Sequence, residues 1–368
     1  MIFIVYAAVL IFALRVYFML RGSLKEKKIT FNGLPEELPF VSVIIPARNE
    51  EANIEACLRS LEESTYPMEK FELIVVNDMS EDKTSEIIEH YRKKHSNIIP
   101  LNLTQEAEKE NIPGKPGAIH AGIKKAKGEY LLMTDADCVV EKKWIENIVT
   151  NFQLGHYDLL PSFTLIKGNA LFDKIQEIEW IYMLTMASAG IGNGYPLGCY
   201  GNNLSIRNDT YERLGGYPEI NFSVTEDLAL LLDVYKSGGK VHYICDRDAV
   251  VTTNPCETFS EYIKQKKRWA VGGTALKWKA VAFVATSVML WAALFYSLFT
   301  ANIAALAAVL ATRVIGDYFL IDSSLKKLKL KKLRKWIIPS VLFFMFMELI
   351  IPFTLLSKKV KWKGRTFN

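Results

Sequence analysis

The sequence predicts an α/β domain, a parallel sheet covered by helices, held between apolar segments that enter a membrane. Three observations support this fold class. Short β-branched runs alternate with helix-like stretches between residues 40 and 135. Three of these runs end in clusters of polar residues, and both ends of the 368-residue chain are strongly apolar. Such alternation requires parallel strands with helices on both faces of the sheet.

The composition excludes several classes of protein. The chain is 50% hydrophobic and 23% charged, which provides for a full core together with a membrane portion. The net charge of +5 is concentrated beside apolar segments, so we expect contact with a membrane bilayer and no nucleic-acid partner. The five cysteines are scattered without a CxxC pair, which argues against a disulfide framework or a zinc site and indicates a reducing compartment.

An N-terminal transmembrane anchor is predicted at residues 1–22. The stretch from Met1 to Leu20 is apolar apart from Arg15, and a basic stretch follows at residues 21–28. This length is sufficient to cross a bilayer. Because the positive charges follow the apolar run, we expect an uncleaved anchor whose C-terminal side is cytoplasmic.

A catalytic domain is predicted at residues 38–258. Its strands are expected at 40–46, 71–78, 98–103 and from Tyr130 to Asp135, and its helices at 50–64, 84–95, after Pro116, at 170–188 and from Thr225. A glycine-rich loop, residues 190–201, precedes Asn202.

Polar clusters follow three of the predicted strands: residues 46–50, residues 77–80, and Asp135-Ala136-Asp137. Ligands of open α/β sheets bind beyond the carboxyl ends of the strands. Two carboxylates one residue apart suit a hard cation such as Mg²⁺ or Mn²⁺, which shares its oxygen ligands with phosphates. A diphosphate is therefore the expected ligand. The alternative is a simple acidic turn, because Asp is common in turns.

Two further stretches fit the same ligand. Lys115 lies between glycines at the start of a predicted helix, where helix-terminal amides and the ammonium would hold a phosphate. It is not part of a Walker A loop, whose spacing is absent. Glu226 and Asp227 open another predicted helix after Thr225, and there helix capping is the alternative interpretation.

The C-terminal third is predicted to lie at and in the membrane. Residues 259–279 form a basic amphipathic helix, for which an interfacial belt of cations and Trp is the alternative to a catalytic role. Residues 280–357 form a membrane region, and a basic tail follows at 358–368.

Within the membrane region, residues 281–318 are long enough for a hairpin that turns near residues 300–302, with Arg313 and Asp317 placed to pair. Residues 325–335 have the pattern of a surface-lying segment. Residues 336–356 are expected to be re-entrant or interfacial, because a full crossing would put the basic tail outside.

The motifs occur in an order that resembles membrane-bound family 2 glycosyltransferases, which include cellulose, hyaluronan and poly-N-acetylglucosamine synthases and ceramide glucosyltransferase. The resemblance covers about residues 40–274. It rests on Val41–Glu50, the Asp78 turn, Gly114-Lys115, Asp135-Ala136-Asp137, Glu226-Asp227 and Gln265-Lys266-Lys267-Arg268-Trp269. It implies a GT-A fold, with a Rossmann-like mixed sheet, and an inverting transfer of a sugar from a nucleoside diphosphate sugar, with a UDP-sugar expected.

The resemblance also implies roles for individual residues. Asp227 would be the catalytic base, and the other catalytic residues would be Glu226, Gln265, Arg268 and Trp269. Asp137, together with Asp135, would bind Mg²⁺ or Mn²⁺. Substrate binding would fall to Pro46, Ala47, Asn49, Glu50, Asp78, Lys115, Asp135 and Asn202. Asn77 and His120 depart from the pattern, since many relatives have Asp and Asn there. We expect His120 to be a helix-surface or core-edge residue and not a catalyst.

The acceptor is expected to be a lipid hydroxyl, which would make the product a glycolipid. Residues 281–318 carry almost no polar side chains that could line a conduit for a growing polymer. The alternative is a processive enzyme of polysaccharide biosynthesis with a glycan acceptor. We expect a multi-pass protein of the inner or plasma membrane with a cytoplasmic catalytic domain. The oligomeric state stays open.

Two other classes of protein are the alternatives to an enzyme. A transporter or channel would place its ionisable residues within the spans, whereas here the motif acids precede them. A catalytically inactive sensor of sugar nucleotides would be expected to lose the base or the metal carboxylate, and Asp137 and Asp227 are both present.

Overall fold

The computed structural model describes residues 2–26, 38–110, 112–221, 223–356, 360–362 and 365–367. The chain divides into two compact units. The sheet unit comprises residues 27–167 and 198–254, and the helical unit comprises residues 1–26, 168–197 and 255–368. The segment 168–197, which the expected domain 38–258 includes, therefore belongs to the helical unit.

The sheet unit is built on a six-stranded sheet of order β3-β2-β1-β4-β8-β6. Its strands are β1 (Val41–Ala47), β2 (Phe71–Asp78), β3 (Ile98–Leu103), β4 (Tyr130–Thr134), β6 (Leu159–Pro161) and β8 (Asn203–Arg207). A smaller sheet of order β5-β9-β7 joins Val139–Val140, Val251–Thr253 and Thr164–Ile166, and it was not predicted.

The strand directions agree with the predictions. The four strands of the alternating region, β1 to β4, are parallel, and β8 runs antiparallel to both of its neighbours, β4 and β6, which makes the sheet mixed as the resemblance implies. Asn203, at the start of β8, is held by Trp144 Nε1, which donates to its side-chain oxygen, and by its own amide, which donates to the carbonyls of Phe163 and Ala249. Because Asn203 pairs with Thr134 at the end of β4, the reversal brings Gly201 and Asn202 to the carboxyl edge of the sheet.

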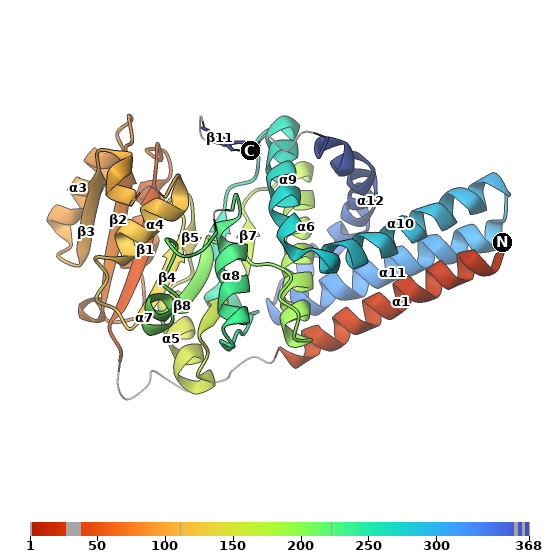
Figure 1. Ribbon diagram of the computed structural model, residues 1–368, viewed down its shortest axis with the longest axis horizontal. Coiled ribbons are helices and arrows are strands. Elements are labelled where there is room, and N and C mark those ends of the chain that lie inside the picture. The colour runs from red at the N-terminus through yellow and green to blue at the C-terminus, as the bar shows by residue number, and fades with distance from the viewer. Residues whose placement is uncertain are drawn as a thin grey trace. The chain divides into compact units, whose positions relative to one another are not determined.

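Helices of the sheet unit cover both faces of the larger sheet (Figure 1). They are α2 (Ile54–Glu62), α3 (Thr84–Lys94), α4 (Lys115–Ile123), α5 (Trp144–Gly155), α7 (Asn208–Arg213) and α8 (Glu226–Lys236), with short 3₁₀ turns η1 (Met68–Lys70), η2 (Glu106–Lys109) and η3 (Arg247–Ala249). The expected helix 50–64 is shorter at its start, because Asn49 turns the chain with a φ of 54°.

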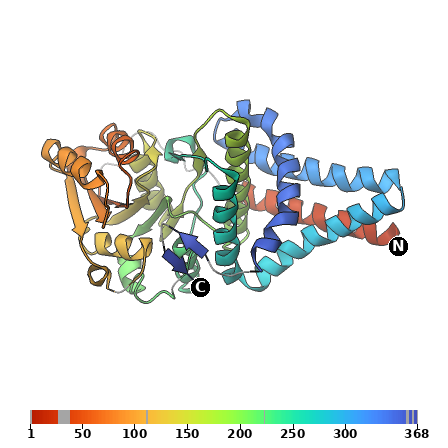
Figure 2. The same cartoon turned by 90° about the horizontal axis from the view of Figure 1, so that it is seen from above.

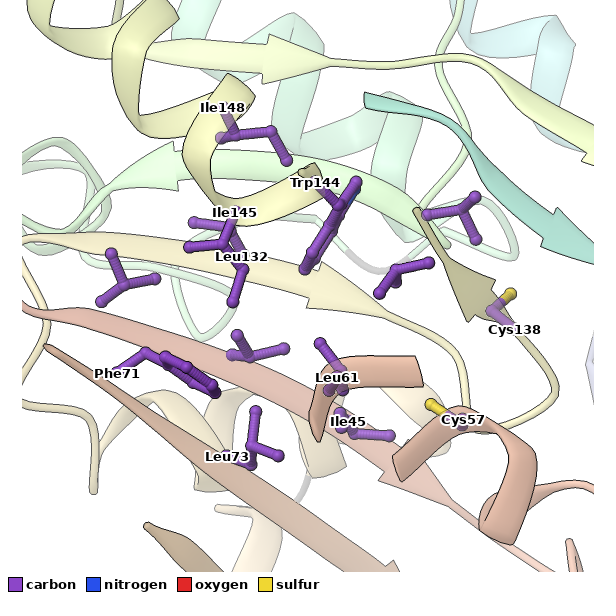
Figure 3. Close-up of a cluster of buried hydrophobic side chains, with 14 of the residues drawn as sticks. Ile45, Cys57, Leu61, Phe71, Leu73, Leu132, Cys138, Trp144, Ile145 and Ile148 are labelled. Atoms are coloured by element: carbon purple, nitrogen blue, oxygen red, sulfur yellow. The ribbon is translucent and has the colours of Figure 1, made fainter. Parts of the chain in front are cut away.

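The core of the sheet unit follows from the two-residue period of its strands. Gly122 of α4 approaches Ile44, Ile74 and Val76 on one face of the sheet. The residues between them point to the other face and pack against α2, α3 and α5. Figure 3 shows part of this second cluster, in which Ile45, Leu73, Leu132, Leu61 and Trp144 are buried. Full burial of each such aliphatic side chain is worth about 1.5–3 kcal/mol.

The helical unit consists of α1 (Ile2–Lys25), α6 (Leu171–Gly192), α9 (Phe259–Gly273), η4 (Thr274–Leu276), α10 (Trp278–Phe299), α11 (Ile303–Lys327), η5 (Lys331–Trp336), α12 (Ile337–Thr354), β10 (Val360–Trp362) and β11 (Arg365–Phe367). Figures 1 and 2 show α1 running beside α10 and α11. Four described helical segments are long and apolar enough to cross a membrane, namely Ile2–Lys25, Trp278–Phe299, Ile303–Lys327 and Lys331–Thr354.

The predicted hairpin is confirmed, since α10 and α11 are joined by a turn at residues 300–302 and Asn302 caps α11. The predicted pair is confirmed as well. Arg313 Nε lies 2.6 Å from Asp317 Oδ2, and Arg313 also reaches Glu348 Oε1 of α12 at 2.9 Å. Each charge in this buried group therefore has an opposite charge beside it, as a low-dielectric surrounding requires.

Two expectations for the end of the chain stay predictions. In segment 325–335, Leu325, Leu328 and Leu333 are buried against the protein while most of the lysines are exposed, and its position on a membrane surface is untested. Residues 337–354 form one continuous helix with Pro352 in its last turn, and whether this helix crosses the membrane or lies at its interface is untested. Lys27 and Lys28 lie outside the described residues, and of the basic tail 358–368 only β10 and β11 lie within them.

Candidate active site

The loops that follow β1 and β2 are bonded to each other. The main-chain N–H of Asn49 donates to Ser80 Oγ at 3.0 Å, and Asn49 Oδ1 accepts from the N–H of Glu81 at 2.8 Å. The N–H of Glu50 donates to Thr84 Oγ1 at 2.8 Å. These bonds make a fixed rim at the carboxyl ends of the two strands, next to Pro46 and Ala47.

Asp78 is the last residue of β2, and its side chain is 7% exposed. Its Oδ1 contacts the ammonium of Lys109, and its Oδ2 lies 4.0 Å from Arg48 Nη1. Neighbouring Asn77 accepts from the N–H of Ser80 and donates to Asn102 Oδ1 at 3.0 Å. The amide at position 77 thus closes the turn, and the carboxylate that remains available at this strand end is Asp78.

Asp135 and Asp137 follow β4 in a tight turn. Lys115 Nζ lies 2.6 Å from Asp135 Oδ1, while Asp137 Oδ2 accepts from Thr253 Oγ1 at 3.2 Å. Burial, and then the nearby charges of Asp135 and Glu50, raise the pKa of Asp137 above its ordinary value. The carboxylates of Asp137, Asp135 and Glu50 thus lie near one another, and that of Asp137 is buried. The sequence prediction of a carboxylate pair beyond β4 agrees with this arrangement.

The chemistry of these donors fits a hard divalent cation. Among the residues that the structure describes, no group of three or more His, Cys, Asp and Glu side chains could hold a metal by itself. The carboxylates of Asp137 and Asp135 could supply ligands on one side of the ion. Phosphate and water oxygens would complete its coordination shell. This division of ligands is usual for Mg²⁺.

Lys115 opens α4 and connects two parts of the sheet unit. Its predecessor Gly114 has a φ of 76°, which favours glycine and lets the chain turn into the helix. Lys115 Nζ lies 3.4 Å from Glu226 Oε1 in addition to its contact with Asp135. Burial favours the neutral amine, but the charges of Asp135 and Glu226 outweigh it and raise the pKa of Lys115. The end of β4 and the start of α8 therefore face the same site.

Asp227 lies in the first turn of α8, with its carboxylate held by two main-chain N–H groups. Gly201 donates to Oδ2 at 2.8 Å, and Leu228 donates to Oδ1 at 2.7 Å. Burial, together with the charge of Glu226, raises the pKa of Asp227 to about 6. The bond from Leu228 satisfies one main-chain N–H of the first helical turn, whereas the N-cap residue Thr225 makes no side-chain capping bond. A carboxylate with this pKa is suited to general-base catalysis near neutral pH.

Asn202 is buried and makes contacts within the protein. Its Oδ1 accepts from Thr164 Oγ1 at 3.0 Å, and its main-chain carbonyl accepts from Thr134 Oγ1 at 3.1 Å. Its role in substrate binding stays a prediction. Beside it, a methyl group added at Gly201 would lie 3.4 Å from both Asp227 Cβ and Glu226 Oε1. The chain at Gly201 therefore lies close to the two acids, at a distance where an added methyl group would make van der Waals contact with both.

His120 lies on α4 and is bonded on both ring nitrogens. Nδ1 is 2.9 Å from the Tyr211 hydroxyl, and Nε2 is 3.2 Å from Glu110 Oε2. Burial lowers the pKa of His120. A cavity of about 370 Å³ nearby is lined by residues that include Glu110, Pro116, Tyr217 and Glu226. His120 thus joins α4 to α7, in agreement with a core-edge residue.

Gln265, Arg268 and Trp269 lie on α9 of the helical unit. Between them, Lys266 is buried, 2.7 Å from Glu179 Oε2 of α6 and 4.0 Å from the centre of the Trp269 ring. The Trp269 ring also meets Trp180 edge to face, with 5.4 Å between ring centres. Lys266 is therefore not an exposed belt cation, and it helps to hold Trp269 against α6. The catalytic roles of Gln265, Arg268 and Trp269 stay predictions.

Sequence reasoning missed three contributors to this site. Thr253, at the end of β9, and Gly201, in the turn before β8, contact the acids, and the sequence pattern reveals neither the pairing of β9 nor the direction of β8. Lys109 lay in an acidic, irregular segment with no motif. Nothing in the sequence around Lys109 indicates that its side chain is buried, so no signal could have identified it.

Comparison with known proteins identifies the family. The sequence pattern of "Glycosyl transferase family 2" matches residues 42–213, and that of "Glycosyl transferase family group 2" matches residues 130–352, more than half of the chain. The probable glycosyltransferase YdaM of Bacillus subtilis is 28% identical over 77% of this chain and 69% of its own length. A beta-monoglucosyldiacylglycerol synthase of Trichormus variabilis is 28% identical over 64% of this chain, which spans 49% of that relative.

Among solved structures, the mannosyltransferase PcManGT of Pyrobaculum calidifontis, in complex with GDP-Man and Mn²⁺, superimposes with a TM-score of 0.60. The two chains are 18% identical, and the match covers 96% of this chain and 95% of the other. This likeness confirms the predicted GT-A fold. The family patterns confirm that the protein is an enzyme, a glycosyltransferase. The chain belongs to the family 2 glycosyltransferases, enzymes that transfer a sugar from a nucleotide sugar.

Proposed function

We propose that this enzyme transfers a sugar from a nucleoside diphosphate sugar, in the first instance a UDP-sugar, to a hydroxyl of a membrane lipid, with inversion at the anomeric carbon. The observation that carries the proposal is the position of Lys115. Its ammonium lies 2.6 Å from Asp135 and 3.4 Å from Glu226, so the acids of β4 and α8 share one site. Donor and acceptor chemistry can then meet there.

The donor is held by the edge formed by β1, β2 and β4. Asp78 accepts from the nucleoside, the rim of Pro46, Ala47, Asn49 and Glu50 surrounds it, and Lys115 pairs with the diphosphate. Asp137 and Asp135 would hold Mg²⁺ or Mn²⁺, whose chemical contribution is to neutralise charge on the departing diphosphate. The complex of PcManGT with GDP-Man and Mn²⁺ supports this combination of ligands for the fold.

Asp227 acts as the base. It takes the proton from the acceptor hydroxyl as that oxygen attacks the anomeric carbon, and the bond from this carbon to the diphosphate oxygen breaks on the opposite face. One displacement inverts the centre, so a single base suffices. A hydrolase would instead need two carboxylates with a water between them. The N–H groups of Gly201 and Leu228 fix the Asp227 carboxylate for this step.

A lipid acceptor is supported by the four helices that could cross a membrane. We assign Trp269, Gln265 and Arg268 to acceptor and leaving-group contacts, and we place the protein in the cell membrane with the sheet unit on its cytoplasmic side. A relative named as a beta-monoglucosyldiacylglycerol synthase, at 28% identity, supports a diacylglycerol-type lipid. In this arrangement the acceptor presents its headgroup hydroxyl without leaving the bilayer.

The test uses the full chain in lipid nanodiscs. UDP-sugars and GDP-sugars are offered one at a time with Mn²⁺ or Mg²⁺, diacylglycerol and a membrane lipid extract, and the released nucleoside diphosphate is measured. We expect metal-dependent release with one donor, and a lipid carrying a single added sugar by mass spectrometry. A polymeric product would show a polysaccharide synthase instead. No release with any donor, or equal release from an Asp227→Asn variant, would contradict the proposal.

A further inference from the structure

Lys109 is a lysine whose side chain is 0% exposed, and its ammonium lies on the carboxylate of Asp78. It ends η2, immediately before Glu110, which turns the chain with a φ of 53°. Besides Asp78 Oδ1, the ammonium approaches Glu106 Oε2 at 3.4 Å. Glu106 is about half exposed, so Asp78 is the partner of Lys109 that shares its burial.

The fold makes room for this lysine on α4. A methyl group added at Gly117 would come within 2.9 Å of Lys109 Cβ and 3.0 Å of its Cδ. The bare backbone of α4 at Gly117 is therefore the wall along which the Lys109 stem runs. A buried ammonium is costly unless it is paired, and removing one member of a buried pair leaves the other charge unpaired. Lys109 is therefore held in its ion pair with Asp78.

Lys109 and Lys115 serve different strand ends. Lys115 contacts Asp135 beyond β4, whereas Lys109 contacts Asp78 at the end of β2, and β1 lies between these strands. The phosphate-binding role proposed for Lys115 therefore does not extend to Lys109. Lys109 acts on the residue that we assign to the nucleoside.

We propose that Lys109 is a positioning residue that holds the Asp78 carboxylate in a fixed orientation, so that the nucleobase site selects a base with a ring N–H beside a carbonyl. Uracil and guanine have this edge, and cytosine and adenine do not. The inference rests on the proposed function, because it takes the nucleoside to lie at Asp78, and it goes further by assigning the origin of base selection.

The selection follows from hydrogen-bond chemistry. Lysine donates three bonds and accepts none, and an ionised carboxylate only accepts. With Oδ1 occupied by Lys109, the remaining lone pairs of Asp78 can accept from the N3–H of uracil or the N1–H of guanine. Cytosine N3 and adenine N1 present a lone pair to the same oxygen, and two acceptors repel.

The experiment compares one pyrimidine nucleotide with another and one purine nucleotide with another. The full chain is titrated calorimetrically in Mn²⁺ with UDP against CDP, and with GDP against ADP, and in parallel with pyrophosphate. The variants are Lys109→Met and the double variant Asp78→Asn/Lys109→Met, in which neither charge is left unpaired. The control is Lys124→Met, since Lys124 is an exposed lysine that pairs with Glu110.

We expect the wild-type protein to prefer UDP over CDP, or GDP over ADP, by at least about tenfold, because a site built for a donor group rejects an analogue that lacks it. Lys109→Met should bring this ratio close to one and leave pyrophosphate affinity within about twofold. Should Lys109→Met fail to fold, the double variant should show the same loss of the ratio. Lys124→Met should keep the wild-type ratio.

The ratio of the affinities for UDP and CDP, or for GDP and ADP, separates a positioning role of Lys109 from a merely structural one. A folded Lys109→Met or double variant that keeps the wild-type preference overturns the inference, as does a wild-type protein that binds all four nucleotides equally. In both cases metal-dependent nucleotide binding, and with it the proposed function, stands. Absence of any nucleotide binding by the wild-type protein overturns both.

Discussion

The ammonium of Lys115 lies 3.4 Å from the carboxylate of Glu226 while it also contacts Asp135 at 2.6 Å. Residues that are far apart in the sequence are thereby joined at one edge of the sheet. The single cation also keeps Asp135 and Glu226 from facing each other as unscreened like charges. Replacing it should therefore affect both the bound phosphates and the approach of α8 to β4.

Lys115→Met should weaken binding of nucleoside diphosphates by about 10–100-fold, because a hydrogen bond to a charged group is worth about 1.5–3 kcal/mol. Binding of the uncharged nucleoside should change far less. Calorimetric titration with UDP and with uridine measures the two effects. Lys125→Met, an exposed lysine just beyond α4, is the control. Equal losses for UDP and uridine would exclude a phosphate contact and indicate general distortion of the site.

Asp227→Asn should retain nucleotide binding within about twofold and lower the rate of sugar transfer by about 10²–10⁴-fold, the usual contribution of a general base. The amide has the shape of the carboxylate but cannot take the proton from the acceptor. Transfer is followed by release of the nucleoside diphosphate, and binding by calorimetry. Asp233→Asn, in the same helix, is the matched control. Near-normal turnover of Asp227→Asn would show that another group is the base.

Activity should fall as the pH drops through about 6, because Asp227 works only when ionised and its pKa is raised from 3.8 to about 6 by burial and by Glu226. Below that pH, kcat/KM should decrease about tenfold per pH unit. The pH profile of kcat/KM for a fixed donor and acceptor measures this limb. A limb near pH 4 would mean that Asp227 behaves as an ordinary exposed carboxylate, in conflict with its surroundings here.

Much of the sheet could be predicted from the sequence. The strands at 71–78 and 98–103 are confirmed at both ends, because each is a short, mainly apolar run bounded by polar turns. The direction of β8 could not be predicted, since an alternating pattern of side chains is the same when read in either direction. Because this direction brings Gly201 to Asp227, the contact between these two residues could not be predicted either.

The site was predictable where chemistry lies at the end of a strand and unpredictable where a side chain comes from an irregular segment. Asp78, Asp135 and Asp137 follow buried runs and mark the carboxyl edge. Lys109 comes from a 3₁₀ turn, and no period indicates which carboxylate a long, flexible side chain reaches. The same limit applies to Lys266, whose neighbours in the sequence are partly exposed while it pairs with Glu179 in the core of the helical unit.

Asp137→Asn should separate metal binding from stability. The carboxylate of Asp137 is buried beside Asp135 and Glu50, and like charges in such a place destabilise the metal-free fold. The amide removes one of these charges and still accepts from Thr253. We therefore expect the metal-free variant to melt at least about 2 °C above the wild-type protein, since about 1 kcal/mol shifts the midpoint of a chain of this size by that order.

The same change should lower the affinity for Mn²⁺ in the presence of UDP by at least about tenfold, because a neutral amide oxygen is a weaker ligand for a hard cation than a carboxylate. Thermal melts with and without Mn²⁺ and UDP measure both effects in one experiment. Wild-type protein should gain stability from Mn²⁺ with UDP, by mass action, and Asp137→Asn should gain little. A variant that is less stable without metal, yet is stabilised by Mn²⁺ as strongly as the wild type, would show that Asp137 has a structural role and does not bind the ion.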